Sequence, residues 1–352
     1  YWIMSKLNAL IAGSTGYIGI QLIKLLIKHP NINIKYLCGN TSKGKSINTF
    51  DKSIKKKLPR IIKFSNKLLK NVDLVFTALP NGEAQKLSNN LLPNNILIDL
   101  SADFRLKSIK DYLKWYKIKH SSKNNIKNSI YSLPEFTKKI INKYKIISCP
   151  GCYPTSILLP LLPLIKSNLI NPNGIIIDSK SGYSGAGRGV HKKYADKNLY
   201  ESLSAYAVGF HRHNSEIEQE LNYYTGKKVK FSFTPHLSPM FRGILTTIYV
   251  DLKEKSSINK INSKLKNFYK DHFFIKIKPI NKFISTNDVI NTNFCHISVC
   301  KSKFKNKIVI LSVIDNLIKG GAGQAVQNIN NYYGFDIKKG LIWKMWISDL
   351  LA

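Results

Sequence analysis

The segment that most constrains this chain is a strand, a glycine-rich turn and a helix close to its N-terminus. The apolar run Leu7–Ala12 is typical of a buried strand, and an amphipathic pattern continues to about Lys28. Between them the glycines follow a G-x-x-G-x-x-G spacing, which lets the backbone turn tightly and approach a pyrophosphate at the helix N-terminus. This order of elements predicts a dinucleotide site. The predicted contacts are Gly13, Ser14, Thr15, Gly16, Tyr17, Ile18 and Gly19.

The loop after the second predicted strand, Ile32–Cys38, indicates which dinucleotide binds. In NAD-binding folds an acidic residue at this position bonds the ribose 2′-hydroxyl. Residues 39–45 contain no acid, but they contain hydroxyl groups and two lysines, which suit a 2′-phosphate. We therefore expect NADP, with Asn40 and Ser42 as contacts. A much tighter affinity for NADH than for NADPH would contradict this expectation.

Further strands are expected at 73–79 and 96–100, with helical segments between them. This alternation predicts an α/β fold with a Rossmann-type doubly wound parallel sheet. Ligands bind such sheets beyond the C-terminal ends of the strands. Leu79 and Pro80 are therefore candidate cofactor contacts, and Arg105, which follows the next strand, is a candidate substrate contact.

The most reactive group in the sequence is expected at Cys152. A strand at 145–147 is followed by Pro150-Gly151, which predicts a turn, and then by an apolar segment that runs to about Ile165. A thiol at the start of a helix lies at the positive end of the helix dipole, which favours the thiolate over the ordinary thiol of pKa about 8.5. We expect Cys152 to be a nucleophile. Two alternatives are a small buried apolar residue and a C-x-x-C redox or zinc pair with Cys149, although no second C-x-x-C supplies further zinc ligands, so no metal is expected.

The second half of the chain carries glycine, histidine and arginine segments between strands. A strand at 175–180 precedes a Gly- and hydroxyl-rich loop at 181–189 that could wrap an anion. A strand at 206–210 is expected to end in His211-Arg212-His213, with Asn214 capping the following helix. In extended backbone residues 211 and 213 face the same way, so both imidazoles are candidates for general acid/base work. The predicted substrate contacts here are Ser184, Gly185, Arg188, Glu216, His236 and Arg242, and the cofactor contacts are Ser181 and Gly182.

Near the C-terminus, β-rich segments at 246–252, 294–300 and 308–314 predict a second, α+β domain with a largely antiparallel sheet. His236 and Arg242 lie in a segment, 233–243, that is expected to connect two strands. The glycine-rich start of the last helix is expected to return to the first domain and complete the cofactor pocket. The residues predicted to do so are Asn316, Gly323 and Gln324.

Composition excludes several classes of function. The net charge of +35 comes mostly from lysine, spread along the chain with abundant isoleucine and asparagine, which AT-rich codons explain without a nucleic-acid partner. Five cysteines, an odd number, argue against a disulfide framework and for a reducing, cytoplasmic compartment. The longest apolar stretch, 157–165, contains proline and is too short to span a membrane, and no signal peptide is visible.

Taken together, the motifs resemble those of the N-acetyl-gamma-glutamyl-phosphate reductases of the arginine pathway. The matching segments run in family order from Gly13–Gly19 through Pro150–Thr155 and His211–Ile217 to Lys319–Asn328. The resemblance implies an NADPH-dependent enzyme related to aspartate-semialdehyde dehydrogenase that assembles as a homodimer or homotetramer. It also implies catalysis by Cys152 and by a histidine of the His211–His213 segment. The family usually has Asn where Cys149 stands, which raises the possibility of an inactivating disulfide with Cys152.

The resemblance implies two domains: an NADP-binding domain, 1–150 completed by 318–352, and a catalytic and oligomerisation domain, 151–317. The implied reaction converts N-acetyl-gamma-glutamyl phosphate into N-acetylglutamate semialdehyde through a thioester on Cys152. Two alternatives stay open: reduction of another acyl phosphate such as aspartyl phosphate, and a non-catalytic NADP-binding sensor.

Overall fold

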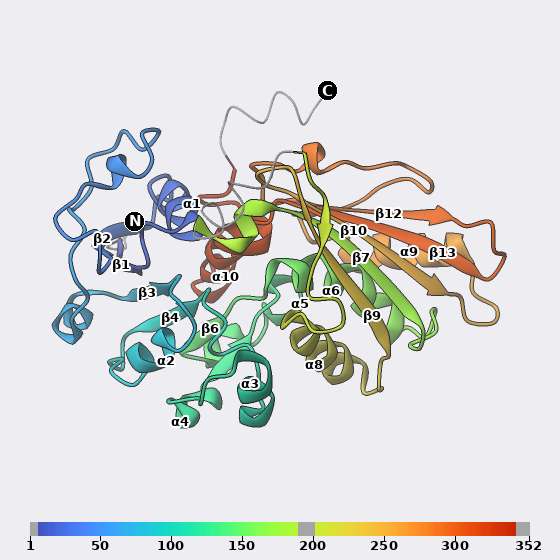
Figure 1. The fold of residues 1–352 in the computed structure, drawn as a ribbon, viewed down its shortest axis with the longest axis horizontal. Helices are drawn as coiled ribbons and strands as arrows, with labels where there is room; N and C mark the ends of the chain where they lie inside the picture. The colour runs from blue at the N-terminus through green and yellow to red at the C-terminus, as the bar shows by residue number, and fades with distance from the viewer. Residues whose placement is uncertain (1–5, 189–200, 343–352) are drawn as a thin grey trace. The chain divides into compact units, whose positions relative to one another are not determined.

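The computed structural model describes residues 6–188 and 201–342 (Figure 1). These residues divide into two compact units, each with its own sheet. The first unit comprises residues 6–150 together with 321–342, and the second comprises the described residues between 151 and 320. No helix within the described ranges combines the length and apolarity that crossing a membrane requires.

The first unit is built on a six-stranded parallel sheet in the order β2-β1-β3-β4-β6-β5. The first three residues of its central strands β3 and β4 are all Ile, Leu, Val or Phe, and every residue of both strands is buried, as expected for strands covered on both faces. The parallel sheet predicted from the alternation of strands and helices is confirmed. The strands are β1 Leu7–Ala12, β2 Ile32–Cys38, β3 Leu74–Thr77, β4 Ile96–Asp99, β5 Ser129–Tyr131 and β6 Ile146–Ser148.

The last helix of the described chain, α10 (Gly323–Tyr332), belongs to this first unit and packs against α1 and α5. Two asparagines anchor it. Asn328 Oδ1 accepts from Ser132 Oγ at 2.7 Å, and Asn330 Oδ1 lies 2.9 Å from His29 Nε2. The C-terminal segment is therefore part of the core of the N-terminal unit. The other helices are α1 Tyr17–Leu26, α2 Glu83–Ser88, α3 Ile109–Tyr116, α4 Lys123–Ile126 and α5 Pro134–Thr137, with short 3-10 turns η1 Ile47–Thr49, η2 Asn66–Asn71 and η3 Ile141–Lys143.

The second unit contains a seven-stranded mixed sheet in the order β11-β12-β13-β10-β7-β9-β8 (Figure 1). Four of its six pairings are antiparallel, and β7–β9 and β11–β12 are parallel. The largely antiparallel second sheet is therefore confirmed. The strands are β7 Ile175–Gly182, β8 Ser204–Ala205, β9 Phe231–Ser238, β10 Ile244–Asp251, β11 Ile275–Ile277, β12 Cys295–Lys301 and β13 Lys307–Ile314.

Helix α6 (Cys152–Lys166) is the buried centre of the second unit and packs against β10, β13, α8 and α9. It contains two internal prolines, and Pro163 cannot donate to the carbonyl of Leu159 four residues earlier. The hydroxyl of Tyr269, the last residue of α9, donates to that carbonyl instead. The remaining elements are α8 His213–Thr225, α9 Ile258–Tyr269, 3-10 turns η4 Tyr183–Ala186 and η5 Thr286–Asp288, and a π-helical turn η6 Ile318–Ala322.

Three local predictions are wrong in this unit. The strand expected at 206–210 is a turn, because Ala207 and Gly209 adopt positive φ angles of 46° and 75° that a strand does not allow. Helix α8 is capped by Arg212 and not by Asn214, which lies inside the first helical turn. His236 was expected in a connection between two strands. It lies within β9, because this strand continues through the neighbouring Pro235.

Candidate active site

In the first unit a cavity of about 790 Å³ opens at the C-terminal ends of β1, β2 and β3. Gly13 adopts a φ of +84°, and a side chain there would collide with the carbonyl of Ala78; a side chain on Gly19 would collide with the carbonyl of Gly13. These two glycines thus keep backbone close to backbone, as a dinucleotide turn requires. The cavity is large enough for such a ligand. The predicted contacts that line it are Gly13, Thr15, Gly16, Asn40, Leu79 and Pro80.

The wall of this cavity beyond β2 is formed by Gly39, Asn40 and Thr41, none of them acidic. The acid that does line the cavity, Glu83, is paired with Lys86 at 2.7 Å on α2. The donor groups at the β2 end therefore fit the extra phosphate of NADP better than the bare ribose of NAD.

Other predicted cofactor contacts are not among the residues lining this cavity. Ser14 is buried, and its Oγ donates to the carbonyl of Cys38 at 3.1 Å, which ties the turn to β2. Ser42 and the first residues of α10, Gly323 and Gln324, are buried in the first unit. Tyr17, Ile18 and Gly19 form the first turn of α1, and Asn316, Ser181 and Gly182 belong to the second unit.

In the second unit Cys152 is the first residue of α6 and is half-buried. The preceding Gly151 is the N-cap in extended backbone, with φ −64° and ψ 158°. Its N–H donates to Glu216 Oε2 at 3.0 Å, and its carbonyl accepts from Thr155 Oγ1 at 2.9 Å. A Cβ on Gly320 would lie 2.7 Å from Cys152 Cβ, so the backbone of Gly320 packs closely against Cys152. Two hydrogen bonds to Gly151 and this close packing thus fix the turn at Cys152.

A cavity of about 400 Å³ brings Cys152 together with His211 and His213. The two imidazole centroids lie 4.6 Å apart. They meet because His211 ends a turn and His213 begins α8, and not because both extend from a strand as predicted. Ser181, Gly182 and Gly185, predicted from the glycine-rich loop, also line this cavity.

His211 is held as a neutral ring. Burial, with a smaller contribution from the adjacent Arg212, lowers the pKa of His211 to about 4. Its Nδ1 accepts from the backbone N–H of His213 at 3.2 Å, so the proton of the neutral ring is assigned to Nε2. This Nε2 lies 3.5 Å from the hydroxyl of Tyr206. His211 can therefore offer an N–H to a developing oxyanion at neutral pH.

Two tyrosines that the sequence analysis missed complete the cavity. Tyr206 donates to the hydroxyl of Tyr153 at 3.2 Å, and Tyr153 donates to the carbonyl of His236 at 3.1 Å. Burial raises the pKa of Tyr153 far above its ordinary value, so this hydroxyl keeps its proton. Tyr153 directly follows Cys152 in the sequence, so its position next to the nucleophile could have been used to predict it. Tyr206 could not be found in this way, because it was assigned to a strand that does not form.

The predicted anion-binding side chains have other partners. In the first unit Arg105 is buried, and its Nε donates to the carbonyl of Cys149 at 2.8 Å. In the second unit His236 Nδ1 lies 3.0 Å from Asp178 Oδ1, and Arg242 Nη1 lies 3.1 Å from Asp315 Oδ2. Ser184 is buried and accepts from Asn316 Nδ2, while Arg188 is exposed at the end of the described segment.

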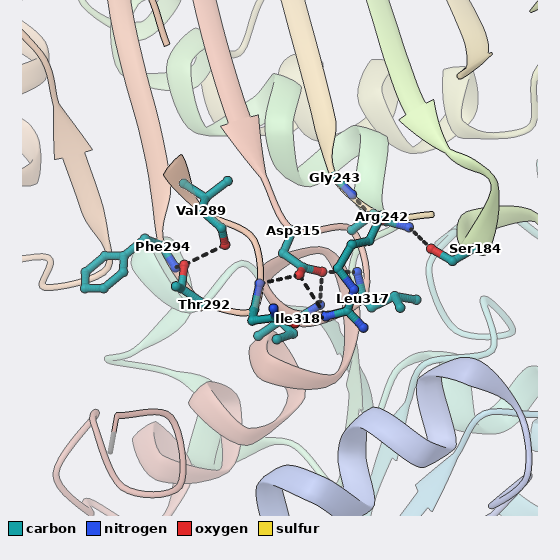
Figure 2. A network of polar contacts seen from close by, with 11 residues as sticks. Ser184, Arg242, Gly243, Val289, Thr292, Phe294, Asp315, Leu317 and Ile318 are labelled. Carbon is teal, nitrogen blue, oxygen red and sulfur yellow. Dashed lines mark hydrogen bonds and ion pairs between the residues drawn. The ribbon is translucent and has the colours of Figure 1, made fainter. Parts of the chain in front are cut away.

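Asp315 is the centre of a buried polar network beside β10 and β13 (Figure 2). Its Oδ1 accepts from the backbone N–H groups of Leu317 and Ile318, at 2.8 and 3.1 Å. Its Oδ2 pairs with Arg242 and accepts from the N–H of Asn291. The next residue, Asn316, accepts from the N–H of Gly243 at 2.7 Å. These contacts show that Arg242 and Asn316 hold the loops of the second unit together.

We expect Asp315→Ala to lower the free energy of unfolding by about 3–5 kcal/mol, because it leaves the Arg242 charge and several N–H groups without their partner in the interior. Denaturant unfolding followed by circular dichroism measures this. Glu83→Ala, which breaks the exposed pair with Lys86, is the control and should cost about 0–1 kcal/mol. Equal losses for the two variants would contradict the prediction.

None of the five cysteines, all of which lie in described residues, is in a disulfide. Cys149 is fully buried, its sulfur accepts from Asn328 Nδ2 at 3.8 Å, and burial raises the pKa of its thiol to about 12. Among the described residues no group of three His, Cys, Asp or Glu side chains is placed to hold a metal.

We expect iodoacetamide at pH 8 to modify Cys152 well before Cys149, since only the thiolate reacts and Cys149 stays protonated. Peptide mapping by mass spectrometry measures the order. Cys300, half-buried on β12, is the internal reference for a thiol away from a helix start. Cys149→Ala should alter neither the rate at Cys152 nor turnover by more than about threefold. Early modification of Cys149, or a Cys149–Cys152 disulfide under mild oxidation, would show the thiol to be reactive.

Comparison with known proteins agrees with this geometry. Residues 8–144 match the family described as semialdehyde dehydrogenase, NAD binding domain, and residues 152–316 match semialdehyde dehydrogenase, dimerisation domain. The chain is 42% identical over 332 residues to an N-acetyl-gamma-glutamyl-phosphate reductase of Clostridium botulinum, covering 94% of this chain and 96% of the relative. It is 40% identical over 339 residues to the Ehrlichia chaffeensis protein of the same name, covering 96% and 97%.

Solved structures show the same fold. Aspartate semialdehyde dehydrogenase II of Vibrio cholerae superposes with a TM-score of 0.71 at 16% identity, covering 94% of this chain and 99% of that one. The Candida albicans aspartate semialdehyde dehydrogenase, solved with NADP, gives a TM-score of 0.66 at 17% identity, covering 94% and 99%.

Proposed function

Because this chain belongs to the N-acetyl-gamma-glutamyl-phosphate reductases of the semialdehyde dehydrogenase family, we propose that it reduces N-acetyl-gamma-glutamyl phosphate to N-acetylglutamate semialdehyde with NADPH, in arginine biosynthesis. One observation of the structure carries the proposal: the thiol at the start of α6 opens into the same cavity as His211 and His213. A nucleophile next to imidazoles in a confined cavity is the arrangement that acyl transfer requires.

In the first step the Cys152 thiolate attacks the acyl carbon. The C–S bond forms, the bond from the acyl carbon to the phosphate oxygen breaks, and phosphate leaves with the electron pair. The N-terminus of α6, which is the positive end of the helix dipole, stabilises both the thiolate and the oxyanion that develops on the acyl oxygen. The product of this step is a thioester on Cys152.

Bound NADPH supplies the hydride that reduces this thioester. The Nε2–H of His211 is the proposed donor to the oxygen that gains negative charge during this reduction, and the imidazoles of His211 and His213 are the proposed route for its proton. Loss of that proton from the hemithioacetal releases the aldehyde and returns the sulfur of Cys152. Gly185 and Arg188 stay proposed substrate contacts, since Ser184 accepts from Asn316 and Arg242 and His236 pair with carboxylates.

The two units take separate proposed tasks. The first unit, with its glycine-lined cavity, would hold NADP, and the second would carry the chemistry and the subunit contacts. The match to a dimerisation domain supports assembly as a homodimer or homotetramer. None of the five cysteines forms a disulfide, which supports a reducing compartment, and we propose the cytoplasm.

The reverse reaction tests the function. The purified chain is mixed with N-acetylglutamate semialdehyde, phosphate and NADP, and the absorbance of NADPH is followed. We expect kcat/KM to be at least about 100-fold higher than with aspartate semialdehyde, a difference of about 2.7 kcal/mol in transition-state binding. A preference for aspartate semialdehyde would favour the other acyl phosphate, and NADPH binding without turnover of either substrate would indicate a sensor.

A further inference from the structure

Glu216 was predicted from the sequence to contact the substrate, but its position indicates a different task. We infer that Glu216 is a positioning residue, which fixes the backbone in front of Cys152 and the imidazole of His213. The inference rests on the proposed function for the reaction that it serves. It depends on contacts that all lie within the second unit.

The carboxylate of Glu216 lies inside the protein and not in the cavity. Its side chain is fully buried on α8, and Glu216 is not among the residues that line the cavity with Cys152. One oxygen, Oε2, accepts from the N–H of Gly151 at 3.0 Å. The other, Oε1, lies 3.7 Å from Nε2 of His213, one helical turn before it. A single side chain thus contacts both the residue before the reactive thiol and an imidazole that lines the same cavity as the thiol.

Gly151 and His213 also contact each other, which closes the arrangement. A Cβ built on Gly151 would lie 2.5 Å from Nε2 of His213, so the imidazole packs directly against the glycine. The peptide that joins Gly151 to Cys152 begins the helix, so a rotation of Gly151 turns the thiol. By accepting the Gly151 N–H, Glu216 sets the direction from which Cys152 enters the cavity, and the packing of α6 on α8 keeps that direction.

A buried carboxylate is costly unless hydrogen bonds and charges nearby compensate it. Here an amide N–H and an imidazole lie next to it, at the positive end of the α6 dipole. Glu216 therefore orients Gly151, and the same contacts compensate the cost of burying its carboxylate. Gln at 216 keeps an oxygen acceptor for Gly151, whereas Ala keeps none.

Three variants separate positioning from substrate binding: Glu216→Ala, Glu216→Gln and, as control, Glu220→Gln. Glu220 is also buried on α8, one turn further on, and its Oε1 accepts from Gln219. We expect Glu216→Ala to lower kcat about 100-fold with KM within about threefold, because misplacement of a nucleophile by about 1 Å costs this much. The rate of Cys152 alkylation by iodoacetamide should fall at least tenfold relative to Cys300. Glu216→Gln should recover at least tenfold of both losses, and Glu220→Gln should match the wild type.

The outcomes are distinguishable. A raised KM with unchanged kcat in Glu216→Ala would restore the substrate-binding role predicted from the sequence. A lower melting temperature with kcat and alkylation unchanged would reduce Glu216 to a stability contact. Where Glu216→Ala does not fold, Glu216→Asp, which withdraws the carboxylate by one methylene, gives the same test. Should the wild type fail to reduce the acyl phosphate, the proposed function falls, while the alkylation rates alone still decide the positioning role.

Discussion

Replacing Cys152 by serine is expected to lower kcat for the acyl phosphate by about 10⁴-fold or more, the size of effect seen when an enzyme loses its nucleophile. A hydroxyl is far less acidic than a thiol, so the N-terminus of α6 cannot ionise it at neutral pH. NADPH oxidation in the presence of substrate measures the loss. The affinity for NADPH should be unchanged, because the glycine turn that holds it lies in the first unit.

Cys300→Ser is the matched control, since Cys300 is also half-buried but lies on β12. It should retain turnover within about twofold, because Cys300 is not among the residues that line the cavity with Cys152. Turnover by Cys152→Ser within tenfold of the wild type would exclude the thioester route and leave direct reduction of the acyl phosphate as the mechanism.

Gly13→Ala is expected to raise the Kd for NADPH at least about 100-fold and to lower the free energy of unfolding by about 3–4 kcal/mol. Two penalties add at this position. The φ of +84° is unfavourable for alanine by about 1–2 kcal/mol, and the new methyl group collides with the carbonyl of Ala78 at the end of β3. Fluorescence titration with NADPH and denaturant unfolding measure the two effects.

Gly174→Ala separates these penalties. Gly174, in the second unit, has a similar φ of +76°, but a methyl group there would meet nothing within 4 Å. It should therefore cost only the conformational term, about 1–2 kcal/mol, and leave the affinity for NADPH unchanged. If the two variants lose equal stability, the crowding at Gly13 is not what makes that glycine necessary.

The fold could be predicted from the sequence because its signals are local. The apolar run before Gly13 and the helix after it become β1 and α1 as expected, since strand, turn and helix each depend on neighbouring residues. The thiol at the start of α6 follows from Pro150-Gly151 in the same way. These predictions need no knowledge of which strands pair.

The site could be predicted only in part, because its contacts join distant residues. Glu216 meets Gly151 across 65 positions, and nothing in either local pattern indicates that hydrogen bond. His211 and His213 do share a cavity with Cys152, but the strand invoked to bring them there does not form. Arg242 was expected to contact the substrate, yet it pairs with the internal carboxylate of Asp315. The residue type limits which hydrogen-bond or ion-pair partners a side chain can have, and the tertiary structure determines which of them it meets.

The two prolines of α6 have a consequence for how the chain matures. At Pro163 the helix lacks the N–H that would satisfy the carbonyl of Leu159, and the hydroxyl that replaces it comes from Tyr269, 110 residues later. In a nascent chain that ends before α9, the Leu159 carbonyl of α6 lacks the hydroxyl that satisfies it in the folded protein. Helix α6 therefore gains this hydrogen bond only after α9 has been synthesised.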